Sequence, residues 1–219
     1  KVQRLRLAGR GVQLTPAIRV AEIDVETDPI SVDLEALRAG GENLRTAFRE
    51  PLQAALRVKL SEADLNQALA APQFAERLQS IVNQIVANFP GASSQRYELV
   101  DLSVNFQRGN RLGFNLQVQG RDAAGAVMDD LRLTLSTGLE VANGRTFELR
   151  EPEIAINGEP LPPIFAGVAT QFLGNQLDLR NLETFGVVMR LLSLTIDDEG
   201  LEVAAFVRID PETAAAALE

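Results

Sequence analysis

The chain has no cysteine and no histidine among its 219 residues. These absences exclude thiol nucleophiles, Cys/His metal sites, Ser-His-Asp triads and acid–base catalysis by histidine. A carboxylate-only enzyme or an oxygen-ligated cation site stays compatible with the composition. The acidic residues form no clustered motif of either kind, however, and the pairs Asp129-Asp130 and Asp197-Asp198 are typical of turns. We therefore expect a protein that is not an enzyme and that needs neither a cofactor nor a metal.

Basic residues are also few: the chain has 21 of them against 30 acidic residues, which gives a net charge of −9. A nucleic-acid partner favours a basic face, so the acidic balance argues against one. The same balance argues against docking of the whole surface onto anionic lipid heads. The hydrophobic fraction of 46% is ordinary for a globular protein and is enough for a sizeable core.

Charge is missing altogether from one long stretch, PLPPIFAGVATQFLGNQL at 160–177. Its helical part can begin only near Pro163, since proline is tolerated in the first turn of a helix. The remaining run of about four turns is too short to span a bilayer, which takes about 20 residues. We expect a short apolar helix at 163–174 inside the folded domain, with Phe165, Val168 and Phe172 facing a sheet.

Two further helices are predicted in the first half of the chain. Ser61 is a candidate N-cap for a short helix that ends near Ala70, with Asp64 three residues further on. A second helix begins after Pro72, and its apolar residues recur at spacings of three and four. They form a single stripe of Phe74, Leu78, Ile81, Ile85 and Phe89.

From residue 97 the apolar residues recur at every second position, as Val100, Leu102, Val104 and Phe106 illustrate. Similar segments follow up to Ile156, and a closing hairpin covers about 187–209. Each strand has one apolar and one polar face, which is typical of an antiparallel meander that is covered on one side. Strands set in runs, with helices between them, predict an α+β fold. We expect one domain over 1–210 and a tail at 211–219, where Leu218-Glu219 resembles the remnant of a tag.

The predicted strands are long and the predicted helices are short. Strands of 10–13 residues reach up to ~40 Å, whereas each helix spans only ~20–25 Å. A long sheet must twist, so its apolar face is expected to curl strongly around the two apolar helices. The uncovered difference is either plugged by loops or left as an apolar groove. The expected groove lining consists of Phe74, Leu78, Ile81, Ile85, Phe89, Ile164, Phe165, Val168 and Phe172.

Four segments resemble a bacterial lipid-binding family, the LmeA-like proteins. The segment ALRVKLSEADLNQALAAPQF at 55–74 is similar to the centre of that family, and ETFGVVMRLLSLTIDDEGLEVAAFVRI at 183–209 is similar to its closing hairpin. LRLAGRGVQL and IDVETDPISVDL are similar to its opening strands. The resemblance implies a curved sheet wrapped on a helix, as in tubular lipid-binding (TULIP-like) domains, and phospholipid binding in a bacterial envelope. It brings no catalytic residue, and the stretch at 160–177 does not align with it.

Two functions of different class follow from these observations. The first is a module that binds phospholipid or another acyl-chain lipid between the helices and the apolar face of the sheet, in contact with a membrane surface. Such a protein is expected at the cell envelope or the periplasmic side of a membrane, and a segment outside this sequence would anchor or export it. The alternative is a structural or protein-interaction domain with a filled core and no lipid ligand. The volume of apolar space inside the fold distinguishes them.

Overall fold

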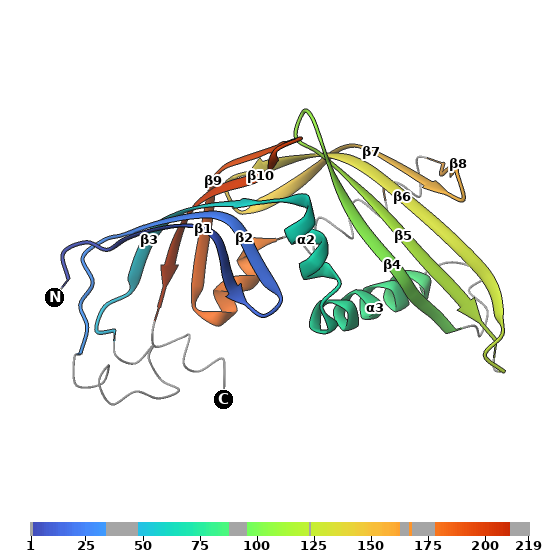
Figure 1. Ribbon diagram of the computed structural model, residues 1–219, viewed down its shortest axis with the longest axis horizontal. Helices are drawn as coiled ribbons and strands as arrows, with labels where there is room; N and C mark the ends of the chain where they lie inside the picture. Colours follow the sequence, from blue (N-terminus) through green and yellow to red (C-terminus); the bar gives the residue numbers. More distant parts are fainter. Residues whose placement is uncertain are drawn as a thin grey trace.

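The computed structural model describes residues 2–33, 48–87, 96–122, 124–162, 167 and 178–210. Within these ranges the chain forms ten strands, two α-helices and one 3-10 helix (Figure 1). The elements are β1 (Arg6–Thr15), β2 (Ile18–Thr27), β3 (Leu52–Leu60), α2 (Glu62–Leu69), α3 (Pro72–Ala87), β4 (Arg96–Gln107), β5 (Arg111–Arg121), β6 (Val127–Ala142), β7 (Thr146–Ile156), β8 (Glu159–Pro160), η2 (Leu179–Phe185), β9 (Val187–Asp197) and β10 (Gly200–Ile209). This predominance of antiparallel strands with few helices agrees with the predicted α+β class.

The strands form two sheets and not the single long sheet that the sequence predicted. One sheet has the order β1-β2-β3-β10-β9 and the other the order β4-β5-β6-β7-β8, and every pairing within them is antiparallel. The physical reason lies at β3, because β2 and β10 occupy both of its edges. After α2 and α3, β4 therefore cannot pair with β3, and it begins a second sheet. Alternation along a strand does not contain this information, since it reports burial and not pairing.

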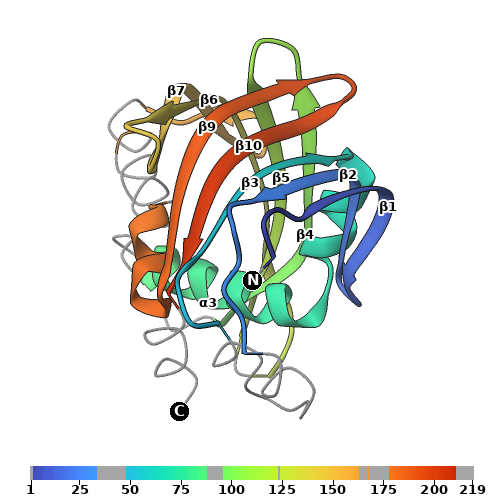
Figure 2. The ribbon, with the colours of Figure 1, turned by 90° about the vertical axis from the view of Figure 1, so that its left-hand side faces the viewer.

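The two sheets meet where turns of the second sheet reach the edge of β9 (Figures 1 and 2). Asn110, in the turn between β4 and β5, exchanges bonds with Ile196: its backbone N–H donates to the Ile196 carbonyl at 3.2 Å, and its Oδ1 accepts the Ile196 N–H at 2.8 Å. The carbonyl of Gly144, between β6 and β7, accepts the N–H of Leu191 at 2.8 Å. Both turns need a positive φ, 56° at Asn110 and 67° at Gly144. Asn and Gly are the residues that adopt it most readily.

A compact core lies beside this junction. Val104, Leu112, Leu139 and Ile196 are buried together, so the core joins β4, β5 and β6 of one sheet to β9 of the other. Leu65 and Leu69 of α2 pack against the same cluster. The helix begins as predicted, because the Ser61 hydroxyl accepts the backbone N–H of Asp64 at 3.1 Å. No helix among the described residues is long and apolar enough to cross a membrane.

Candidate functional site

Strands β4 to β7 present one continuous apolar face. Side chains that are paired across antiparallel strands point to the same side of a sheet. The strand register aligns two such rows across all four strands. One row is Leu102, Leu116, Leu133 and Ile156, and the other is Val104, Phe114, Leu135 and Ile154.

Burial on this face is uneven. Val104 and Val118 are only 2% and 3% exposed, whereas Leu116, Leu133 and Ile156 are all half-buried. Few apolar side chains are fully buried elsewhere either, because the described residues include only eleven buried hydrophobic ones. In a chain that is 46% hydrophobic, this distribution indicates a sheet whose apolar face is incompletely covered by protein.

The helices α2 and α3 are attached to the outer edge of β4 by side-chain amides. Asn66 of α2 donates from Nδ2 to the Val104 carbonyl at 2.8 Å and accepts the Val104 N–H on Oδ1 at 2.7 Å. Gln79 of α3 repeats this pattern further along the strand, with the Tyr97 carbonyl at 2.8 Å and the Leu99 N–H at 2.7 Å. Each amide thus satisfies one donor and one acceptor of the edge strand. The two helices are thereby fixed beside the apolar face.

A partly buried ion pair attaches α2 to the first sheet as well. Asp64 is 4% exposed, and its Oδ1 accepts a hydrogen bond of 2.7 Å from Nη1 of Arg19 on β2. Burial alone would raise the pKa of Asp64, but hydrogen bonds from Ser61 and Arg19, together with the charge of Arg19, outweigh it and hold the pKa below its ordinary value. The carboxylate is therefore ionised at neutral pH. Its position in the first turn of α2 also stabilises the negative charge, because the N-terminus of a helix favours it.

The predicted groove lining can be compared with the structure only in part. Phe74 and Leu78 lie on α3 and are half-buried. Ile81 and Ile85 fall within α3, but their side chains lie outside the described part, as do all of Phe89, Ile164, Phe165, Val168 and Phe172. The lining as a whole stays a prediction. The stripe also omitted Val82, which is 6% exposed and is the buried apolar residue that the structure describes on α3.

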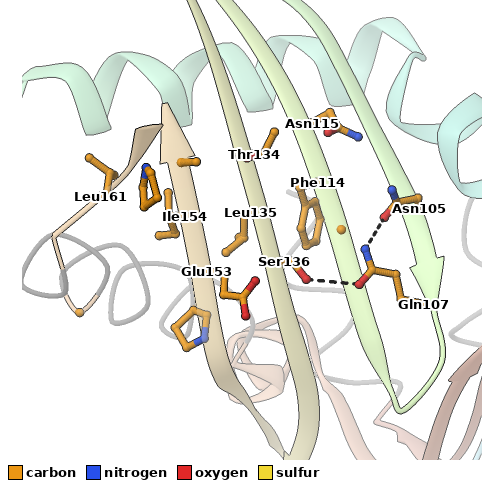
Figure 3. Close-up of a pocket in the computed structure, with 15 residues that line it drawn as sticks. Asn105, Gln107, Phe114, Asn115, Thr134, Leu135, Ser136, Glu153, Ile154 and Leu161 are labelled. Atoms are coloured by element: carbon orange, nitrogen blue, oxygen red, sulfur yellow. Dashed lines mark hydrogen bonds between the residues drawn. The ribbon is translucent and has the colours of Figure 1, made fainter. Parts of the chain in front are cut away.

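A pocket that the sequence did not predict crosses the second sheet (Figure 3). It has a volume of about 1030 Å³, and neither Phe74 nor Leu78 lines it. On β4 it is lined by Asn105 and Gln107 but not by the intervening Phe106, and on β5 by Gly113 but not by Leu112. Since neighbouring residues on a strand point to opposite sides, this selection indicates that the pocket lies on the polar face. Phe114, Leu135 and Ile154, which lie between polar residues, also border it, as does Gly167, the one described residue of the predicted helix at 163–174.

The chain belongs to the LmeA-like phospholipid-binding family, whose model matches residues 1–206. The match includes α2, α3, all strands up to β9 and most of β10, so the apolar rows and the helices beside them are within it. A search among curated proteins finds no match to the chain.

Proposed function

We propose that this protein binds phospholipid without chemical turnover and holds the acyl chains between its helices and the apolar face of the β4–β7 sheet. In this proposal the helices and the sheet enclose the chains as in tubular lipid-binding domains. The lining includes the predicted set on α3, whereas the part assigned to the 163–174 segment stays a prediction, because its one described residue, Gly167, lines the pocket on the polar face. The family supports the choice of phospholipid as the ligand.

The observation that carries the proposal is the half-buried apolar row of Leu102, Leu116, Leu133 and Ile156. Apolar surface that a ligand removes from water contributes about 25 cal/mol per Å² to binding. An acyl chain gains about 0.8 kcal/mol for every methylene that is buried by the same rule. Such binding needs no charged residue.

The first test is solvent extraction and mass spectrometry of the purified protein, combined with transfer of labelled phospholipid from vesicles. We expect lipid at about one or a few molecules per chain. Leu102→Asp places a charge in the apolar row and is expected to abolish uptake, because an acyl chain cannot solvate a carboxylate. The matched control is Ser103→Asp, the next residue on the same strand, which points to the opposite face and is also half-buried.

Leu116→Trp provides a second variant that does not bury a charge. It fills space on the apolar face and should lower the amount of lipid carried while leaving the far-UV circular dichroism unchanged. If folded wild-type protein carries no lipid and takes none from vesicles of varied composition, the acyl-chain proposal fails. The alternative of a structural or interaction domain with a filled core then stands.

In the same proposal the protein acts at a bacterial cell envelope, on the periplasmic side of a membrane, and touches the membrane surface. Exposed leucines on or next to the edge strand β1 support such contact, since Leu5, Leu7 and Leu14 are 51%, 59% and 50% exposed. Vesicle flotation of Leu7→Glu tests this point. If that variant floats with vesicles as well as the wild type does, β1 is not the contact.

A further inference from the structure

The polar face of the β4–β7 sheet carries a cluster of uncharged hydrogen-bonding side chains that acyl-chain binding does not use. Asn105 and Gln107 come from β4, and Ser136 from β6. They border the pocket of about 1030 Å³ on the side opposite the apolar rows, and Figure 3 shows them converging across β5. Asn115 and Thr134 extend the cluster along β5 and β6.

A relay of hydrogen bonds orients the three converging side chains. Nη2 of Arg111 donates to the Ser136 hydroxyl at 3.2 Å, and that hydroxyl donates to Oε1 of Gln107 at 3.2 Å. Nε2 of Gln107 then donates to Oδ1 of Asn105 at 3.2 Å. The Asn105 amide N–H groups end the relay and have no acceptor among the described residues. Asn105 is therefore a donor that is held in place and available to a ligand.

Gly113 makes this convergence possible. It is paired with Asn105 on one side and with Ser136 on the other, so it lies in the middle of the cluster. A Cβ at this position would overlap Oδ1 of Asn105 and lie 2.8 Å from Nε2 of Gln107. Only glycine lets the two amides lie across β5. An alanine would displace them, which gives a variant that disturbs the cluster without removing any polar group.

The charge around the cluster restricts the class of ligand. Glu153 lines the pocket next to Ser136 in the strand register, and its carboxylate has no ion-pair partner among the described residues. Arg111 is the cation of the cluster and lies 3.7 Å from the carboxylate of Glu151. An unpaired carboxylate repels an anionic group, and a single carboxylate is too few for a calcium site, which takes six to eight oxygen ligands.

Amides, hydroxyls and one carboxylate beside the apolar surface of Pro152, Pro160 and Leu161 match a different chemistry. The neighbouring hydroxyls of a sugar or cyclic polyol donate to a carboxylate and accept from amide N–H groups, and its C–H faces pack on apolar side chains. We propose that this pocket binds a neutral polyhydroxylated group, either a free saccharide or polyol or the uncharged ring of a lipid headgroup. Because the polar lining of the pocket comes from the other face of the sheet, binding of a free polyol does not depend on acyl-chain binding.

The test is a titration of the isotope-labelled protein followed by NMR of the side-chain amide signals. The soluble probes are myo-inositol and a panel of neutral hexoses. The lipid probes are phosphatidylcholine vesicles with and without an uncharged glycosyl diacylglycerol. We expect saturable shifts of the Asn105 and Gln107 amide signals with at least one probe. Glu153→Gln and Gly113→Ala should each weaken that binding about tenfold or more, since a hydrogen bond to a charged group contributes roughly 1.5–3 kcal/mol.

Gln117→Ala is the matched control, because Gln117 follows Asn115 on the same face of β5 but does not line the pocket. Its affinity should equal that of the wild type. A response to soluble probes identifies a free polyol, and a response only to the glycosyl diacylglycerol vesicles identifies a headgroup. The proposal is overturned if no probe produces saturable shifts, or if the shifts persist unchanged in Glu153→Gln and Gly113→Ala. Neither result would affect the acyl-chain test with Leu102→Asp.

Discussion

Replacing Asn110 by alanine should weaken the contact between the two sheets and lower the free energy of unfolding. The Asn110 side chain accepts the N–H of Ile196 at 2.8 Å and donates to the Leu194 carbonyl at 3.4 Å, so it takes the place of a neighbouring strand along the edge of β9. Ile196 is 1% exposed, and water cannot replace the lost partner without opening the core. Alanine removes both bonds and places a Cβ-bearing residue without a polar side chain at a φ of 56°.

The magnitude has two parts. A buried N–H that is left without an acceptor costs about 1–3 kcal/mol. The left-handed backbone adds roughly 1 kcal/mol for alanine, since asparagine tolerates that conformation better. The free energy of unfolding should therefore fall by about 2–4 kcal/mol. Asn110→Gly keeps the backbone relaxed and isolates the first part, so it should destabilise by about 1–3 kcal/mol.

Urea denaturation followed by circular dichroism measures the stability of both variants. An unchanged slope of unfolding free energy against urea concentration would show that the variants and the wild type expose the same surface on unfolding. The expected order of midpoints is wild type, then Asn110→Gly, then Asn110→Ala. A midpoint of Asn110→Ala within error of the wild type would refute this account of the junction. So would a glycine variant that is less stable than the alanine variant, because the backbone part would then have the wrong sign.

Three further changes test other contacts. Ser61→Ala removes the N-cap of α2 and should destabilise the protein by about 0.5–2 kcal/mol, measured as a lower denaturation midpoint. The pKa of Asp64 is lowered in the folded state, so its ionised form stabilises the protein above the ordinary pKa of about 3.9, and this stability is lost as pH falls through the folded-state pKa. Asp64→Asn should be less stable at neutral pH, and its stability should depend less on pH in the acid range. Identical plots of stability against pH for variant and wild type would contradict the ion pair. Thr137→Val removes a fully buried hydroxyl that donates to the Arg150 carbonyl at 3.1 Å, and a loss of about 1–3 kcal/mol is expected by thermal unfolding. Thr137 lies where the register between β6 and β7 shifts, between Ser136 and Gly138, and a gain in stability would show that this shift does not need the hydroxyl.

Local patterns in the sequence identified most of the elements correctly. The alternation at Val100–Phe106 predicted β4, and Ser61 with Asp64 three residues on predicted the start of α2. The pair Asn157-Gly158, which reads as a turn, takes positive φ at both residues between β7 and β8. These features depend on residues close together in the chain, so their signals survive in a single sequence.

The division into two sheets could not be predicted in the same way. It depends on β10 pairing with β3 across about 140 residues, and no local pattern records that choice. The polar pocket was missed for a related reason. Asn105, Gln107 and Ser136 read as ordinary solvent-facing positions of alternating strands, and only the register brings them to Gly113. A glycine inside a strand pattern, where close approach of other groups is common, was the one available signal.

The contacts of the Asn66 and Gln79 amides with β4 also affect how readily this protein can aggregate. A free edge strand offers its N–H and C=O groups to any other extended chain, and natural proteins protect such edges against aggregation. Here the protection comes from Asn66 and Gln79, which belong to α2 and α3 and not to β4 itself. Any opening that lifts these helices to admit a guest molecule also uncovers a template for intermolecular β-pairing. Loading and self-association would then share one open state, so a bound guest that keeps the helices closed should also slow fibril formation.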